Sequence, residues 1–148
     1  MPAKNPTESG GFTAEERAAM KARAAELRAE GKQGAKKADG LQAVLDSIAK
    51  MAPEDRALAE RVHVTVTAIA PHLSPKTWYG MPAYADTDGK IVVFFQDSGK
   101  FNYRYCTLGF QDAAHLDDGD LWPVSYALQQ WSTVVERRIV ELVKAAIS

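Results

Sequence analysis

A chain of 148 residues fits one domain, and a domain of this size buries roughly two thirds of the surface that its unfolded chain exposes. The composition, with 46% hydrophobic and 25% charged residues and a formal net charge of -1, is typical of a soluble protein and gives no global indication of a nucleic-acid or membrane partner. A single cysteine, Cys106, excludes an intramolecular disulfide framework and a multi-cysteine zinc site, as expected in a reducing compartment.

The N-terminal segment, residues 1–11, is rich in Pro, Gly, Ser and other polar residues and contains no apolar run that would indicate a secretory signal. No later stretch of the sequence is apolar over the length needed to span a bilayer. We therefore expect a disordered tail on a cytoplasmic protein that has no membrane partner.

The next segment, residues 12–37, is predicted to form a basic, Ala-rich helix and a linker. Thr13, followed three residues later by Glu16, predicts a capping box, and the helix is expected to end at Glu30, before a glycine. The apolar stripe of this helix is thin, which predicts a peripheral position. Its basic residues are interspersed with glutamates and accompanied by one aromatic residue, Phe12, which argues against a nucleic-acid interface.

Two further helices are predicted after the linker, each with an apolar stripe. Asp39 is a candidate cap for the first, and Pro53, followed by two acidic residues, is typical of the first turn of the second. Apolar residues recur in both at the spacing of one helical face, so both are expected to pack on the core. The stripes consist of Leu41, Val44, Leu45, Ile48 and Met51, and of Leu58, Val62, Val66, Ile69 and Leu73.

From Trp78 onward the apolar pattern changes to the period of β-strands. The stretches "MPAYA", "KIVVFFQ" and "KFNYRYCTLGF" are separated by "DTDG" and "DSG", which predict the turns of an antiparallel meander. In the third stretch, the alternation predicts that every second residue from Phe101 to Thr107 faces inward. The stretch "LWPVSYALQQ" predicts another strand, with Pro123 at an edge or strand start because proline cannot donate to a ladder.

Thr133 and Glu136 then predict the capped start of a final helix with an apolar face. Helices, a meander and a last helix, in this order, predict an α+β domain over residues 39–148. We expect N-terminal helices, an antiparallel meander of about four to five strands, and a C-terminal helix packed on one face of the sheet.

The stretch "PHLSPKTWYGMPAY", Pro71 to Tyr84, resembles the signature of the YdhG-like family of domains of unknown function, in which a helix leads into a Tyr-Gly-Met-Pro turn and a strand. The resemblance extends through the meander and "LWPVSYAL". One branch of this family is described as a frataxin-like iron chaperone, so the resemblance implies iron as a candidate ligand. Iron binding of that type uses exposed carboxylates on an acidic helix and a sheet edge, whereas the second helix here carries only Asp39 and Asp46.

Aromatic residues form the first candidate ligand site. In one interpretation they line a mostly apolar pocket for a small molecule, in which tyrosine hydroxyls and a guanidinium are the polar groups. In the other they pack within the sheet and the core, because strands are normally rich in aromatic residues. The candidate ligand-binding residues are Trp78, Tyr79, Met81, Tyr84, Arg104, Tyr105 and Trp122.

The stretch "AHLDDGD" is the candidate metal site, because hard cations such as iron or calcium take carboxylate oxygen and imidazole nitrogen. The alternative is a solvated loop, since Asp and Gly are common in turns. The candidate metal ligands are His115, Asp117, Asp118 and Asp120. The sequence identifies no partner residue that would make a catalytic acid–base or nucleophile of His63, His72 or Cys106.

No Gly-rich phosphate loop, nucleophile elbow or multi-histidine metal motif occurs in the sequence. This favours a non-enzymatic module that binds a small ligand, or iron in the manner of a chaperone. An enzyme that acts on a small polar metabolite in the aromatic pocket, with Tyr or His63 as acid–base, is the alternative. A third hypothesis is an interaction module whose basic N-terminal helix docks on a partner.

Overall fold

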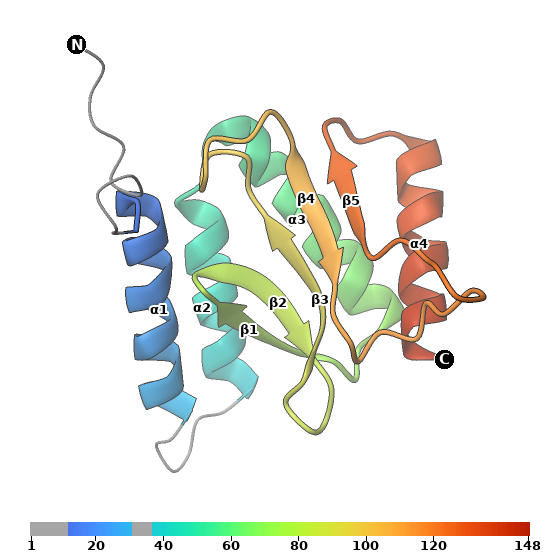
Figure 1. Ribbon diagram of the computed structural model, residues 1–148, viewed down its shortest axis with the longest axis horizontal. Helices are drawn as coiled ribbons and strands as arrows, with labels where there is room; N and C mark the ends of the chain where they lie inside the picture. The colour runs from blue at the N-terminus through green and yellow to red at the C-terminus, as the bar shows by residue number, and fades with distance from the viewer. Residues whose placement is uncertain (1–11, 31–36) are drawn as a thin grey trace.

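The computed structural model describes residues 12–30 and 37–148, and it confirms the predicted α+β fold (Figure 1). The predicted disordered tail and most of the predicted linker lie outside the described residues. The helices are α1 (Ala14–Glu30), α2 (Lys37–Ala49), α3 (Pro53–Ile69) and α4 (Thr133–Ile147), and the strands are β1 (Ser74–Trp78), β2 (Met81–Ala85), β3 (Ile91–Gln96), β4 (Cys106–Phe110) and β5 (Ser125–Leu128). Among these described helices, none has both the length and the apolar character required to cross a bilayer.

The five strands form one antiparallel sheet in the order β1-β2-β3-β4-β5, so the predicted meander of about four to five strands is confirmed, with one strand outside the stretches that the sequence pattern indicates. The additional strand is β1, whose sequence "SPKTW" has no apolar alternation. It forms because it pairs with β2, with Pro75 opposite Tyr84. As an edge strand, β1 tolerates a proline that has no N–H to donate.

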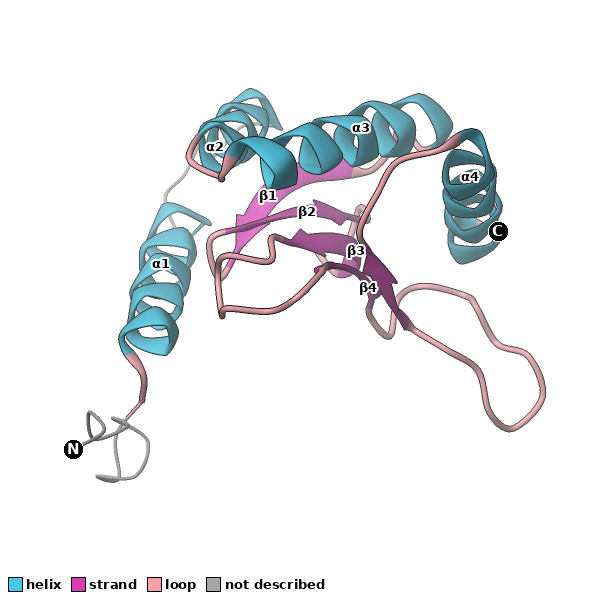
Figure 2. Ribbon diagram, turned by 90° about the horizontal axis from the view of Figure 1, so that it is seen from above, coloured by secondary structure: helices cyan, strands magenta, loops and turns pink. Residues whose placement is uncertain are grey.

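Helices α2, α3 and α4 all lie on one face of the sheet, whereas α1 stands apart beside the end of the sheet near β1 (Figure 2). The core lies between these three helices and the sheet. Cross-strand pairs such as Tyr84–Val93 and Phe95–Leu108 point toward the helices and are buried. The stripe of α3 is confirmed as a core face, since Leu58, Val62 and Val66 are buried.

The predicted facing of the third strand was wrong. The strand begins only at Cys106, and both Cys106 and Leu108 face the helices, whereas Tyr103 lies exposed in the β3–β4 loop. The inward-facing and outward-facing positions are exchanged relative to the prediction because an irregular loop, with Asn102 at a φ of 60°, separates the first aromatic residues from the ladder.

Local hydrogen bonds mark where the helices begin. The predicted capping box of α1 is confirmed, because Thr13 N donates to Glu16 Oε1 at 2.9 Å and Glu16 N donates to Thr13 Oγ1 at 3.0 Å. The N-cap of α4 is Ser132, one residue before the predicted Thr133, and its Oγ accepts from Val135 N at 3.1 Å. Helix α2 begins at Lys37, two residues before the predicted cap.

Gly40 allows α2 to lie directly on β1, because a Cβ at this position would overlap the carbonyl oxygen of Pro75. We expect Gly40→Ala to lower the free energy of unfolding by about 2 kcal/mol, although alanine has the higher helix propensity by about 1 kcal/mol. Urea denaturation measures this loss. The exposed Gln42→Ala on the same helix is the control, and a stabilised Gly40→Ala variant would contradict the close approach.

Candidate functional site

The predicted aromatic pocket does not form as one site, because the sheet separates its members. Tyr84 lies on the helix side at 1% exposure, and its Oη is 2.8 Å from Nδ1 of His63 on α3. Burial raises the pKa of Tyr84 and lowers the pKa of His63, so both side chains are neutral near pH 7. This pair belongs to the interface between α3 and the sheet.

The other predicted aromatic residues lie at three separate places. Trp78 contacts the rings of Tyr79 and Phe94, with centroid distances of 5.1 and 5.2 Å, on the sheet face opposite the helices. Met81 is paired with Trp78 across the β1–β2 turn. Arg104 and Tyr105 stack on each other in the β3–β4 loop, and Trp122 lies in the connection between β4 and β5.

The four predicted metal ligands lie in the β4–β5 connection, where they do not converge. Among the described residues, no group of three or more His, Cys, Asp or Glu side chains is placed to hold a metal ion. His115 instead joins this connection to α4, because its Nδ1 lies 2.9 Å from the carbonyl oxygen of Ser148 and its N donates to the carbonyl oxygen of Ala146. Asp117 and Asp118 line a small hollow of about 220 Å³ with Trp122.

A buried carboxylate, Asp55, organises the end of the sheet where the β3–β4 loop meets α3. It accepts hydrogen bonds from the hydroxyl of Ser98, the N–H of Gly99 and the thiol of Cys106. Burial by itself raises the pKa of Asp55, but these hydrogen bonds together outweigh it and hold the pKa below the usual range. Burial and the neighbouring carboxylate raise the pKa of Cys106 to about 12, so the thiol stays protonated and is a poor nucleophile.

One set of described residues that converges on a ligand-sized space surrounds the two-residue turn between β1 and β2. Tyr79 and Gly80 have φ values of 53° and 80°, the positive pair that a tight hairpin requires. Both of their backbone N–H groups donate to one carboxylate: Tyr79 N lies 2.9 Å from Oε1 of Glu26, and Gly80 N lies 3.0 Å from Oε2. The turn therefore binds a carboxylate supplied by α1.

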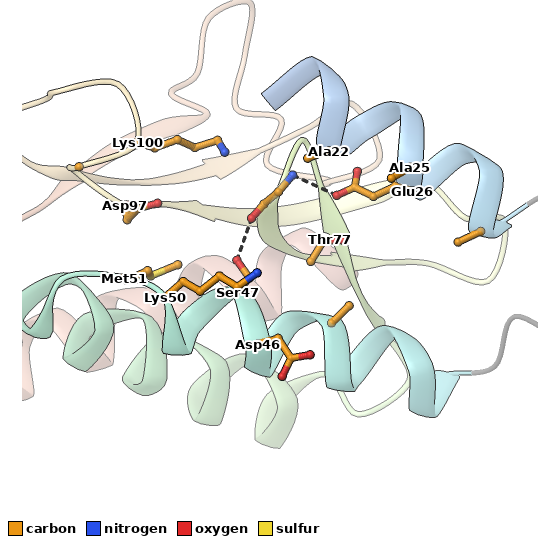
Figure 3. A pocket seen from close by; sticks show the side chains of 14 residues that line it. Ala22, Ala25, Glu26, Asp46, Ser47, Lys50, Met51, Thr77, Asp97 and Lys100 are labelled. Atoms are coloured by element: carbon orange, nitrogen blue, oxygen red, sulfur yellow. Dashed lines mark hydrogen bonds between the residues drawn. The ribbon is translucent and has the colours of Figure 1, made fainter. Parts of the chain in front are cut away.

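Helix α2 holds the same turn from the opposite side, through a hydrogen bond of 2.7 Å from Ser47 Oγ to the carbonyl oxygen of Gly80 (Figure 3). Between α1, α2, the turn and the β3–β4 loop lies a cavity of about 660 Å³. Its polar lining consists of Glu26, Asp46, Ser47, Lys50, Thr77, Asp97 and Lys100, and its apolar lining includes Met51 and several alanines.

Lys100 is the half-buried cation of this cavity. Its Nζ lies 3.1 Å from the position that a Cβ on Gly80 would take, and 5.6 Å from the centre of the Phe101 ring. Within the described part of the chain, no acceptor lies within hydrogen-bond or ion-pair distance of Nζ. Burial lowers the pKa of Lys100, while the charges of Asp97 and Glu26 offset part of this effect.

The carboxylates that line the cavity differ in their surroundings and in their hydrogen-bond partners. Burial and the charge of Asp55 raise the pKa of Asp97, while the charge of Lys100 offsets part of this effect. Glu26 is already engaged by the turn and by Arg23, whose Nη1 lies 3.5 Å from Oε1. The turn N–H groups and Lys100 therefore form a set of donors suited to an anionic group.

The sequence indicates Tyr79 of the turn as a candidate ligand-binding residue, but it does not indicate the polar residues that line the cavity beside it, above all Glu26, Lys50 and Lys100. The Tyr-Gly dipeptide between two strands is a turn signal, and it indicates N–H groups that lie outside the ladder. Nothing in the sequence pairs that turn with Glu26, which lies 54 positions from Gly80.

No protein-family model, curated protein or solved structure matches this chain. The resemblance of the segment from Pro71 to Tyr84 to the YdhG-like family stays a prediction. The candidate site therefore rests on the geometry of this chain alone.

Proposed function

We propose that this protein is a cytoplasmic, non-enzymatic module that binds a small molecule bearing a carboxylate or phosphate group. The cavity between α1, α2 and the Tyr79–Gly80 turn is its binding site. The observation that carries the proposal is the position of Lys100: a half-buried ammonium group without an acceptor among the described residues, beside two backbone N–H groups that already hold a carboxylate. Charge-assisted hydrogen bonds of this kind are the strong ones in ligand recognition.

The size and lining of the cavity support a small ligand. A volume of about 660 Å³ lies within the range of small-molecule sites, and the alanines and Met51 offer apolar contact beside the polar groups. Iron remains a prediction of the YdhG-like resemblance, but the described carboxylates and histidines form no group that would coordinate it. The anionic ligand is therefore the better supported of the two.

The test is titration of the full chain with succinate and with inorganic phosphate, in which calorimetry measures the affinity and amide chemical shifts locate the bound anion. Lys100→Met should weaken binding about tenfold or more, because it removes the charged donor and keeps the length of the side chain. Lys90→Met, which neutralises an exposed lysine in the β2–β3 turn, should change the affinity less than about twofold.

The shifts should concentrate on the amides of Tyr79, Gly80 and Lys100. Equal losses of affinity in both lysine variants would indicate nonspecific charge attraction and would refute the site. Shifts confined to the β4–β5 connection would place the ligand elsewhere and would refute it as well.

A further inference from the structure

We infer that Glu26 is an intramolecular competitor for the turn N–H groups of this site, so that an incoming anion displaces its carboxylate and loosens α1, which forms one wall of the cavity. The inference rests on the proposed function and adds its regulation. The geometry behind it is that a carboxylate of the chain itself occupies both turn N–H groups, at 2.9 and 3.0 Å.

The turn has donors that its own hairpin does not use. The last pair of the ladder is Trp78 with Met81, so the N–H groups of Tyr79 and Gly80 lie beyond the cross-strand hydrogen bonds. Backbone donors that the ladder does not use bond to water or to another acceptor, and successive N–H groups of a turn can form a concave anion site. Glu26 satisfies both donors with its two oxygens.

The attachment of α1 to the rest of the fold depends on this contact, because apolar burial contributes little. Of the side chains described on α1, only Ala19 is fully buried, whereas Met20 and Leu27 are 46% and 53% exposed. The Arg23 guanidinium also lies over the Tyr79 ring, 5.9 Å from its centre, whereas the ion pair of Arg23 with Glu26 lies within α1. A helix held by a few polar contacts is readily displaced.

An external anion satisfies more donors than Glu26 does. Its oxygens accept from the same two N–H groups, and a ligand carboxylate or phosphate that also extends into the cavity reaches Lys100, which Glu26 leaves without a hydrogen bond. Because ligand binding and release of the Glu26 carboxylate are linked, a ligand that replaces Glu26 weakens the attachment of α1, and the contact of Glu26 with the turn lowers the apparent affinity for the ligand.

Glu26→Gln in the full chain separates the possible roles of this residue. The amide keeps the shape of the side chain but loses its charge and one of its acceptor oxygens, so it competes less well for the turn. Titration with succinate and with inorganic phosphate should show about fivefold to tenfold tighter binding than in wild type. Glu15→Gln, an exposed change of the same charge on the same helix, is the control and should leave the affinity unchanged.

Hydrogen exchange provides a second readout that does not depend on affinity. Saturating succinate should accelerate amide exchange in α1 of the wild-type chain while α2, α3 and α4 keep their protection, and Glu26→Gln alone should have the same effect. Slower exchange of α1 with succinate would show that the helix covers the ligand, and would overturn the competitor role.

The affinities separate a failure of this inference from a failure of the proposed function. Weaker binding in Glu26→Gln would make Glu26 part of the ligand site, and unchanged binding would show that it does not compete. Either result overturns the competitor role and leaves the proposed function standing. Failure of succinate and phosphate to bind either chain would refute the proposed function and the competitor role together.

Discussion

Replacing Asp55 with alanine is expected to lower the free energy of unfolding by about 3 kcal/mol, because buried donors lose their common acceptor. Asp55 is 7% exposed and accepts from Ser98 Oγ at 2.8 Å, Gly99 N at 3.1 Å and Cys106 Sγ at 3.3 Å. These contacts join the first turn of α3 to the β3–β4 loop and to β4. Urea denaturation with a fluorescence readout measures the loss directly.

Glu54→Ala is the matched control, because it removes the same charge from the same turn of α3 at an exposed position. It should change stability by about 0.5 kcal/mol or less. Equal losses in the two variants would show that Asp55 acts only through the helix dipole, and the buried network would then contribute nothing measurable.

The same carboxylate should make stability depend on pH in the acid range. Its pKa is lower in the folded chain than the ordinary value of 3.8, so its stabilisation is fully present above that value and is lost as the pH falls through the folded pKa. The stability of Asp55→Ala should therefore fall less steeply below pH 3.8 than that of wild type. Parallel curves for the two proteins would contradict a lowered pKa.

Val62→Asp is expected to cost about 4 kcal/mol or more, and to abolish the cooperative transition if the total stability is modest. Val62 is 1% exposed at the centre of α3, where it belongs to the core cluster with Val66, Tyr84 and Phe95. A carboxylate there is removed from water and has no cationic partner among these side chains. The melting temperature and the denaturant midpoint both report the effect.

Val64→Asp provides the comparison, since it is the same substitution two residues further along the same helix, at a position that is 65% exposed. Helix propensity changes equally in the two variants, so burial is the variable that differs. The Val64 variant should stay within about 1 kcal/mol of wild type. Equal melting temperatures would mean that α3 does not pack on the sheet through Val62.

Elements governed by neighbouring residues could be predicted from the sequence. The capping box joins Thr13 and Glu16, which are three residues apart. Pro53 is the first residue of α3, where the N–H that proline lacks would have no partner within the helix. The turn after β2 is likewise local, because the carboxylate of Asp86 accepts from the N–H groups of Asp88 and Lys90. Such contacts form between residues that the chain already holds close together.

Strand facing could not be predicted with the same success. The alternation from Phe101 to Thr107 is a valid strand pattern, but the ladder begins at Cys106 and the pairing of Cys106 with Leu128 sets which side is buried. A shift of one residue exchanges the two faces of a strand, and the sequence of that strand alone does not determine the register. Strand β1 was missed for a related reason, since only its pairing with β2 makes it a strand.

The sequence by itself determined the order of helices and meander, the α+β class, and the core faces of α3 and α4. The reason is that the spacing of apolar residues within each element indicates both its type and its buried face. Only the tertiary structure decided the candidate site. It divided the aromatic residues between the two faces of the sheet, and it brought Glu26 to the Tyr79–Gly80 turn and Asp55 to Ser98, across 54 and 43 positions of the chain. Contacts over such distances form only when the whole fold closes, since each gains too little to overcome the chain entropy alone.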